Sequence, residues 1–415
     1  MSDWIELEEA WSRLESRVQP LGIERVPLLH ACGRVLAADI EADRDFPPFD
    51  RAAMDGYAVR SDDVRNASAE VPVALEVIGE STPGRGWEGD ARAGNAIRIM
   101  TGAPVPAGWD SVVPVESTSG FDRQRVQVFR AVASGQNIAA RALERRAGDT
   151  VLERGQRLRA VDVGILAMVG AAEVPVFAAP RIALWSTGDE LVAFDACPRP
   201  TQIRNSNAPM LAALAQVEGS VAMLGAVADT PDATLAAVQR GLSFDLLLLT
   251  GGVSMGAYDW VGQALDAAGV RVHFRRVALQ PGKPVLFGTH SGGVVLALPG
   301  NPVSAYTTFR LFAQPVLRRL QGAQQVRPTW LRASARFEWQ RRAPKCILLP
   351  GRLQAAGAAV ERVPYSGSGD LMAYARADCQ IVLPTEVERV QAGQPVRVWP
   401  LEAPFAAAVS TSETS

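Results

Sequence analysis

The spacing of apolar residues changes several times along the chain, beginning with a helical pattern. Ile5, Ala10, Trp11 and Leu14 are spaced so that they fall on one face of a helix. A second apolar run, residues 27–40, follows a break that contains Gly and Pro. We therefore expect two helices within residues 4–40, each with an apolar face that needs a packing partner.

Short β-rich runs replace the helical pattern between about residues 46 and 140. They are separated by Gly, Pro and Asp, the residues that favour turns. The runs are 71–80, 96–100, 111–116 and 125–132. This pattern predicts a small β domain inserted after the first helices, and a helical pattern returns at residues 160–171.

Strands and helices alternate from residue 181 onward. The predicted strands are 181–188, 220–227, 245–252, 272–279 and 294–300, and the predicted helices are 207–217, 231–242, 259–269 and 302–321. The strands are continuously apolar, whereas a strand with one solvated face would alternate apolar and polar residues. We therefore predict a doubly wound α/β domain whose sheet is covered on both faces.

After Gly322 the pattern becomes β-rich again, which predicts a C-terminal β domain, and the last dozen residues resemble a frayed tail. The patterns together predict a multidomain chain of the α/β plus β class. Its predicted parts are a helical and linker domain (1–45 and 142–178), an inserted β domain (46–141), an α/β domain (179–327), a C-terminal β domain (328–402) and a tail (403–415).

Composition and charge restrict the class of protein. A chain of 415 residues with 48% hydrophobic and 21% charged residues is typical of a globular protein with several cores. Its 42 basic and 44 acidic residues give no electrostatic case for nucleic acid or an anionic membrane. The N-terminus is acidic, and the most apolar stretch, 163–172, is too short to cross a bilayer. We therefore expect a cytoplasmic protein.

The four cysteines and three histidines show no spacing typical of a zinc site or a disulfide framework. They are Cys32, Cys197, Cys346, Cys379, His30, His273 and His290. We interpret all seven as ordinary core or surface residues.

The loop "TGGVSMG" follows a strand of four leucines and is a candidate phosphate site. Gly251 and Gly252 would let backbone N–H groups approach an anion, and Thr250 and Ser254 would add hydroxyl donors at the start of a helix. The spacing of the glycines matches neither the P-loop nor the GxGxxG fingerprint. A tight strand-to-helix turn is therefore an equally good explanation.

Several acids also follow predicted strands of the same sheet: Asp229, Asp259 and the pair Asp189 and Glu190. Ligands of open α/β sheets bind at the carboxyl ends of the strands, and carboxylates beside a phosphate are what Mg²⁺ requires. The ordinary alternative for each acid is N-capping of the next helix, and it is strongest for Asp229.

Two further loops of the α/β domain contain polar candidates. Lys283 lies in "PGKP", where its ammonium could meet an oxyanion, although a solvated turn lysine is the default explanation. "LPGNPVSA" places Asn301, Pro302 and Ser304 near a helix N-terminus, although a rigid turn would explain that sequence alone.

In the inserted β domain, Asp55 and Thr101 lie in loops dense in Pro, Gly and Asp. Such loops often carry function, so both residues are candidates for a cleft. Side-chain turns of the Asx or hydroxyl type are the alternative for each residue.

Taken together, six motifs occur in an order that resembles the molybdopterin molybdenumtransferase family, which includes bacterial MoeA proteins and the gephyrin E domain. They are "PPFDRAAMDGYAV", "IMTGAPVPAGWDSVVPVE", "STGDEL", "TGGVSMGAYD", "PGKP" and "LPGNPVSAYTTF". The resemblance covers about residues 5–400. It implies an elongated helical domain built from two segments, and an α/β domain that resembles molybdopterin adenylyltransferase.

The resemblance implies an enzyme that converts adenylylated molybdopterin and molybdate into molybdenum cofactor and AMP, with Mg²⁺ as the divalent cation. It gives Glu190, Asp229, Asp259 and Lys283 catalytic roles, with the three acids also binding the metal, and it places the substrate's phosphates in residues 250–256. Lys283, together with Asn301, Pro302, Ser304 and Ser368, would handle the anion or the substrate.

Members of the family are homodimers, so Asp55 and Thr101 would reach the α/β domain of the opposite subunit. A molybdopterin adenylyltransferase is the implied upstream partner.

The sequence departs from the family pattern at several positions. Ala52 replaces a usual Ser, the segment "NIAARALE" carries Ala139 and Leu143 at usual Arg and Glu positions, and Gln280 replaces a frequent Lys. These changes support a rival interpretation, a non-catalytic dimeric scaffold that has lost insertion activity. An adenylyltransferase-like enzyme built on the α/β domain alone is a second rival, which the flanking β regions disfavour.

Overall fold

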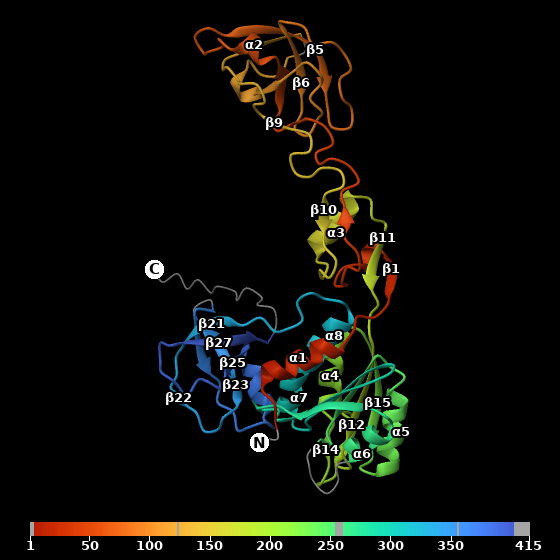
Figure 1. Ribbon diagram of the computed structural model, residues 1–415. Helices are drawn as coiled ribbons and strands as arrows, with labels where there is room; N and C mark the ends of the chain where they lie inside the picture. The colour runs from red at the N-terminus through yellow and green to blue at the C-terminus, as the bar shows by residue number, and fades with distance from the viewer. Residues whose placement is uncertain (1–3, 123, 254–259, 355–356, 402–415) are drawn as a thin grey trace. The chain divides into compact units, whose positions relative to one another are not determined.

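The computed structural model describes residues 4–122, 124–253, 260–354 and 357–401 (Figure 1). The chain forms two compact units. The first contains residues up to 25, residues 155–157 and residues from 175 onward, and the second contains 26–154 and 158–174. Within the described ranges, no helix is long and apolar enough to cross a membrane.

A five-stranded sheet forms the centre of the second unit. Its order is β7 (Ser111–Pro114), β4 (Gly56–Val59), β6 (Asn95–Ile99), β5 (Val73–Ser81) and β8 (Arg125–Val128). β5 and β6 are parallel, and the other pairs are antiparallel. Both faces are covered by apolar clusters, and the β-rich runs predicted from the sequence are confirmed as strands.

The remainder of the second unit contains short elements. They are η1 (Leu28–His30), β2 (Ile40–Glu41) paired with β10 (Thr150–Leu152), β3 (Arg51–Ala52) paired with β9 (Ile138–Ala139), α2 (Ser61–Val64), η2 (Val115–Ser117) and α3 (Ala160–Met168). The predicted helix at 160–171 is confirmed by α3. β1 (Ile23–Pro27) and β11 (Glu173–Phe177) pair where the chain passes between the units.

The helix predicted for residues 27–40 is wrong. Only the single turn η1 forms, because Gly33 adopts a left-handed conformation with φ of 81°. The backbone then pairs with a distant segment, since Gly33 N–H donates to the Leu158 carbonyl and Leu158 N–H donates to the Arg34 carbonyl. The apolar spacing reflects packing of an irregular segment and not a helical face.

The first unit contains a six-stranded sheet. Its order is β15 (Ser220–Val227), β12 (Arg181–Thr187), β16 (Leu246–Thr250), β20 (Gly293–Leu298), β19 (Pro284–His290) and β17 (Arg271–Arg276). The first four strands are parallel, and β19 and β17 complete the sheet in antiparallel pairing. β19 was not predicted, because a two-residue turn joins it to β20 where alternation of strands and helices would require a helix.

Helices cover both faces of this sheet, as the apolar strands predicted. α1 (Leu7–Arg17), α4 (Asn207–Gln216), α7 (Pro302–Thr308) and α8 (Gln314–Leu320) pack on one face with Leu184 and Leu248. α5 (Pro231–Gly241) and α6 (Trp260–Ala267) pack on the other face with Trp185 and Leu249 (Figure 1). The helix predicted at 302–321 is interrupted by a π-helical turn, η3 (Phe309–Ala313).

A second sheet lies in the C-terminal part of the first unit. Its order is β18 (Leu279–Gln280), β23 (Cys346–Gln354), β24 (Ala359–Arg362), β21 (Leu331–Ala335), β27 (Pro395–Pro400) and β25 (Cys379–Leu383). β25 also pairs with β23, so five strands close into a small barrel. The pair β22 (Trp339–Gln340) and β26 (Arg389–Val390) and the 3₁₀ segment η5 (Leu371–Arg376) complete this part. The predicted C-terminal β runs are thus confirmed.

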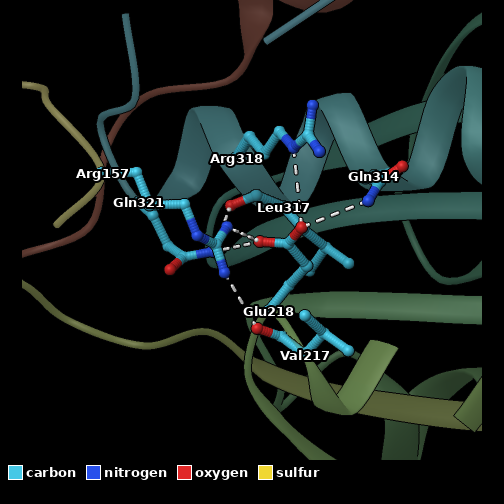
Figure 2. A network of polar contacts seen from close by, with 7 residues as sticks. All are labelled: Arg157, Val217, Glu218, Gln314, Leu317, Arg318 and Gln321. Carbon is cyan, nitrogen blue, oxygen red and sulfur yellow. Dashed lines mark hydrogen bonds and ion pairs between the residues drawn. The ribbon is translucent and has the colours of Figure 1, made fainter. Parts of the chain in front are cut away.

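A buried carboxylate, Glu218, joins three segments of the first unit (Figure 2). It follows α4, and its side chain is only 1% exposed. Arg157 Nη1 lies 2.6 Å from one carboxylate oxygen, and Gln321 Nε2 donates to the same oxygen over 3.1 Å. Arg318 Nε and Gln314 Nε2 lie 3.5 and 3.3 Å from the other oxygen. Each carboxylate oxygen of Glu218 therefore has two donor groups from the surrounding side chains.

Two effects on the pKa of Glu218 oppose each other. Burial raises the pKa, but the charges of Arg157 and Arg318 and the hydrogen bonds of Arg157 and Gln314 outweigh burial and lower it below the ordinary value of 4.5. The folded protein therefore holds Glu218 ionised at pH values at which the unfolded chain already binds a proton. The network contributes stability above pH 4.5, and this contribution is lost as the pH falls below that value and through the lower pKa of the folded state.

We expect Glu218→Gln to lower the free energy of unfolding by about 1–3 kcal/mol at pH 7.5, because it leaves two partly buried arginines without their anion. Urea denaturation should show this difference shrinking as the pH falls below 4.5. The control is Glu9→Gln, which removes an ion pair with Arg13 in which both side chains are largely exposed. It should cost less than about 0.5 kcal/mol. Equal effects of the two substitutions would contradict the role of the network.

Candidate functional site

A pocket of about 480 Å³ lies at the carboxyl ends of β12, β16 and β20, the edge at which the sequence predicts a site. It is called here the strand-end pocket. Its walls are formed by residues 186–188, 190, 191, 203–207, 229, 250–253, 284 and 299–302. The pair β13 (Leu191–Val192) and β14 (Ile203–Arg204) contributes one wall. Of the candidates, the pocket brings together Glu190, Asp229, Thr250, Gly251, Gly252, Asn301 and Pro302.

The glycines after β16 are required by the geometry of the loop. Gly251 and Gly252 have φ values of 93° and 65°. A Cβ atom at Gly251 would lie 2.5 Å from the Thr187 carbonyl oxygen, and one at Gly252 would lie 2.9 Å from the Thr187 hydroxyl. The chain therefore bends closely against β12 and presents an uncovered backbone to the pocket.

The Thr250 hydroxyl is used inside the protein. It donates to the Pro299 carbonyl over 3.1 Å and accepts a hydrogen bond of 3.1 Å from Asn207 Nδ2. The same amide donates to the Gly300 carbonyl over 2.7 Å. Thr250 thus ties together the ends of β16 and β20 and the start of α4, so its side chain shapes the pocket.

Acidic side chains gather at one side of the pocket. The backbone N–H of Asp229 donates to the Asp189 carboxylate over 3.0 Å, and Glu190 lies on the same wall. Partial desolvation, followed by the nearby charges of Asp189 and Glu190, raises the pKa of Asp229. The helix that follows is capped by Thr230, whose hydroxyl accepts from Ala233 N–H, so the capping explanation for Asp229 is wrong.

Oxygen ligands of this kind suit Mg²⁺, which prefers carboxylates and phosphate oxygens. Glu190 and Asp229 provide two carboxylates at the pocket. In the ranges that the structure describes, no group of three or more His, Cys, Asp or Glu side chains is placed to hold a metal ion. Asp259, the third acid expected from the sequence, and Ser254 lie outside the described residues.

Two pocket residues that the sequence did not single out carry unpaired polar atoms. The Thr187 hydroxyl and the Asn207 amide oxygen are both buried and have no hydrogen-bond partner among the described residues. Burying such atoms is unfavourable unless something completes their hydrogen bonds. Their only signal in the sequence is position, since Thr187 ends a strand and Asn207 begins a helix.

A second pocket, of about 750 Å³, lies beside the first and shares Ser206 and Pro302 with it. We call residues 366–370, which form much of its lining, the serine loop. Asn301 Nδ2 donates to the Ser368 hydroxyl over 2.8 Å, and Val303 N–H donates to the Ser368 carbonyl over 3.0 Å. The structure therefore places Ser368 against the start of α7, next to Asn301 and Pro302.

Lys283 and Ser304 line neither pocket among the described residues. Lys283 Nζ lies 4.3 Å from the centroid of the Trp4 ring, which is a cation–π contact. Ser304 is buried in the first turn of α7, where its carbonyl accepts a hydrogen bond from the Thr308 hydroxyl. These contacts hold neither side chain toward Glu190 or Asp229 of the strand-end pocket.

Asp55 and Thr101 belong to the second unit and contact each other. The backbone N–H and the hydroxyl of Thr101 both donate to the Asp55 carboxylate over 2.7 Å. These two hydrogen bonds lower the pKa of Asp55. Both residues are exposed, so the pair places a carboxylate of fixed orientation on the surface of that unit.

Comparison with known proteins gives consistent matches along most of the chain. Residues 5–170 match the MoeA N-terminal region (domains I and II). Residues 183–319 match a probable molybdopterin-binding domain, and residues 332–401 match the MoeA C-terminal region (domain IV).

Two curated relatives are named molybdopterin molybdenumtransferase. The protein from Nostoc sp. is 36% identical over 384 residues, which cover 90% of this chain and 88% of the relative. The protein from Staphylococcus aureus is 32% identical over 400 residues, which cover 95% of each chain. A solved structure of the molybdopterin biosynthesis moeA protein from Pyrococcus horikoshii superposes with a TM-score of 0.83 at 28% identity, covering 96% of this chain and all of that one.

We expect Gly251→Ala to destabilise the protein more than Gly225→Ala, because only the former adds a steric clash. Both glycines have similar positive φ values, 93° and 95°, so both substitutions carry roughly 1–2 kcal/mol of backbone strain. A Cβ at Gly225 would meet nothing within 4 Å, whereas one at Gly251 would press on the Thr187 carbonyl. Denaturant unfolding should show an added cost of about 1–3 kcal/mol for Gly251→Ala. Equal losses would mean that the loop does not need this close approach.

Proposed function

The chain belongs to the MoeA family of molybdenum cofactor biosynthesis, and from that premise we propose that it is a molybdenum insertase. The proposed substrates are adenylylated molybdopterin and molybdate, and the products are the molybdenum cofactor and AMP. The observation that carries the proposal is the strand-end pocket, in which a bare glycine loop faces carboxylates at one sheet edge.

The residues of the pocket suit a pyrophosphate group. Gly251 and Gly252 line the pocket without side chains, so phosphates could approach the backbone there. The unpaired Thr187 hydroxyl can donate to a phosphate oxygen, and the Asn207 amide oxygen can accept a hydrogen bond from a bound substrate. These groups would orient the substrate and replace part of its hydration.

Charge compensation at the pocket requires a cation, because Asp229, Asp189 and Glu190 already repel one another. We propose Glu190, Asp229 and Asp259 as the residues that hold Mg²⁺. When bound, the ion would neutralise phosphate charge during cleavage of the pyrophosphate link.

The oxyanion substrate would bind beside the phosphate site, at the second pocket. Ser368 and Asn301 are the candidates, since their side chains are joined and lie next to Pro302, which lines both pockets. Lys283 and Ser304 remain candidates for anion handling. Lys283 could bind the anion only if its ammonium moved away from the Trp4 ring.

We further propose a cytoplasmic homodimer that receives its substrate from a molybdopterin adenylyltransferase. In such a dimer Asp55 and Thr101 would complete the pocket of the opposite subunit. The hydrogen bonds between them keep the Asp55 carboxylate ionised and fixed in direction, as a contact to a substrate would require.

The purified protein is expected to release AMP from adenylylated molybdopterin when both Mg²⁺ and molybdate are present, and to form active cofactor. Chromatographic measurement of AMP checks the first product, and reconstitution of a molybdenum enzyme checks the second. Omitting molybdate is the control. A dimeric scaffold without insertion activity, to which Ala139 and Leu143 point, would release no AMP at any molybdate concentration.

Asp229→Asn is expected to reduce AMP release by about 100-fold or more, because one cation ligand is lost. Raising the Mg²⁺ concentration should restore part of the rate. Asp232→Asn is the matched control, since Asp232 lies exposed in the first turn of α5 and does not line the pocket. Similar rates in both variants would show that Asp229 does not hold the cation.

A further inference from the structure

A fully buried glutamine, Gln380, lies among the apolar residues of β25. All five residues of this strand are buried, and Gln380 itself is 0% exposed. Its Nε2 donates to the Thr307 hydroxyl and to the Tyr374 hydroxyl, each over 2.8 Å. Its Oε1 has no hydrogen-bond partner within the described part of the chain.

An apolar side chain would fit this position without an unpaired oxygen. An unpaired buried acceptor is unfavourable, and a polar group that is only partly satisfied contributes less to stability than an apolar group of the same shape. The stability of the barrel therefore does not explain the glutamine. Gln380 instead fixes the positions of its two partners, because hydrogen bonds are directional whereas apolar contacts are not.

The three residues of this network come from three different elements. Thr307 is on α7, Tyr374 is on η5 and Gln380 is on β25. Tyr374 is also held by its ring, which packs edge-on against Tyr306 with centroids 5.7 Å apart. Burial raises the pKa of Tyr374 to about 12, so it stays a neutral phenol and a hydrogen-bond partner at working pH.

η5 begins directly after the serine loop, residues 366–370. Asp370 caps η5 by accepting from Ala373 N–H over 3.1 Å. Its second oxygen accepts from the backbone N–H and the hydroxyl of Ser366, over 3.0 and 3.1 Å. Asp370 thus closes the loop on itself and joins it to the first turn of η5.

The other end of the arrangement is the start of α7, which carries the pocket residues Asn301 and Pro302. Ser368 bonds to Asn301 and to the backbone of Val303 at this end. Thr307, one and a half turns further along the same helix, is the point at which Gln380 bonds. The serine loop thus contacts the start of α7 directly, and η5, which follows the loop, is joined to Thr307 of α7 through Tyr374 and Gln380.

We propose that Gln380 is a positioning residue for oxyanion binding, which acts by fixing η5 and the serine loop against α7 through Tyr374 and Thr307. The proposal rests on the proposed function, in which the serine loop binds molybdate. It assigns Gln380 no contact with the substrate. Loss of the network should loosen the oxyanion site and leave the phosphate part of the strand-end pocket unchanged.

The test uses two substitutions at Thr307 that separate its hydroxyl from its volume. Thr307→Val keeps the volume and removes the hydroxyl, whereas Thr307→Ser keeps the hydroxyl and removes a methyl group. Gln380→Met removes the amide and keeps the length of the side chain. Each variant of the full chain is compared with the wild type for its KM for molybdate, its KM for adenylylated molybdopterin, its kcat and its unfolding by urea.

We expect Thr307→Val and Gln380→Met to raise the KM for molybdate about ten-fold, the effect of losing one well-placed hydrogen bond. The KM for adenylylated molybdopterin and the kcat at saturating molybdate should stay within about two-fold of the wild type. Thr307→Ser should keep the wild-type KM although it unfolds at a lower urea concentration. If Thr307→Ser raises the KM as much as Thr307→Val does, packing is responsible and the proposal is wrong.

Amide hydrogen exchange in residues 364–373 provides a measurement that does not depend on catalysis. Exchange should be faster in Thr307→Val and Gln380→Met than in the wild type and in Thr307→Ser. Unchanged exchange in the first two variants would overturn the positioning role. Absence of AMP release by the wild type would instead overturn the proposed function, and the exchange measurement would still decide whether Gln380 holds the loop.

Discussion

The parallel register of β12, β16 and β20 is the constraint on which the site depends. Ser186 pairs with Thr250, and Thr250 pairs with Leu298, so the three strands end at the same level of the sheet. The residues that follow, Thr187, Gly251 and Pro299, therefore meet at one edge. A shift of one residue in any of these pairings would turn the buried side chains to the opposite face. The apolar clusters on the two faces of the sheet thus fix the register that builds the pocket.

The polar groups of the pocket are satisfied by hydrogen bonds to different degrees. Thr250 has both a donor and an acceptor partner, which is the usual condition of a buried hydroxyl. Thr187 and Asn207 each retain an unpaired atom, and partial burial, followed by the charges of Asp189 and Glu190, raises the pKa of Asp229. Each of these features is unfavourable in the isolated protein and would become favourable with the substrate and cation that we propose for the pocket. The unpaired atoms and the repelling acids are linked, because one bound ligand with its cation would supply both the missing hydrogen bonds and the missing positive charge.

The sequence predicted most elements of the α/β domain because their apolar patterns are strong and their ends are marked by Pro and Gly. It failed where tertiary pairing replaced local preference, as at Gly33, whose backbone pairs with Leu158, and at β19, whose partner strand decides its conformation. The glycine loop and the acids of the pocket were found because small residues and carboxylates after a strand are a local signal. Thr187, Asn207 and Gln380 were missed because their importance comes from unpaired atoms and distant partners, which no local pattern encodes.

Buried polar residues anchor both helices whose first residues line the pocket. α4 begins at Asn207, and beyond its last turn Glu218 binds donors from α8 and from Arg157. α7 begins at Pro302, and Thr307 in its last turn accepts from Gln380. Apolar packing alone tolerates small sliding of a helix, since its contacts are not directional, whereas each of these anchors fixes one point along the helix axis. The N-termini that line the pocket are thereby held at a defined distance from the strand ends, which is the precision that the proposed binding of a phosphate and an oxyanion side by side would require.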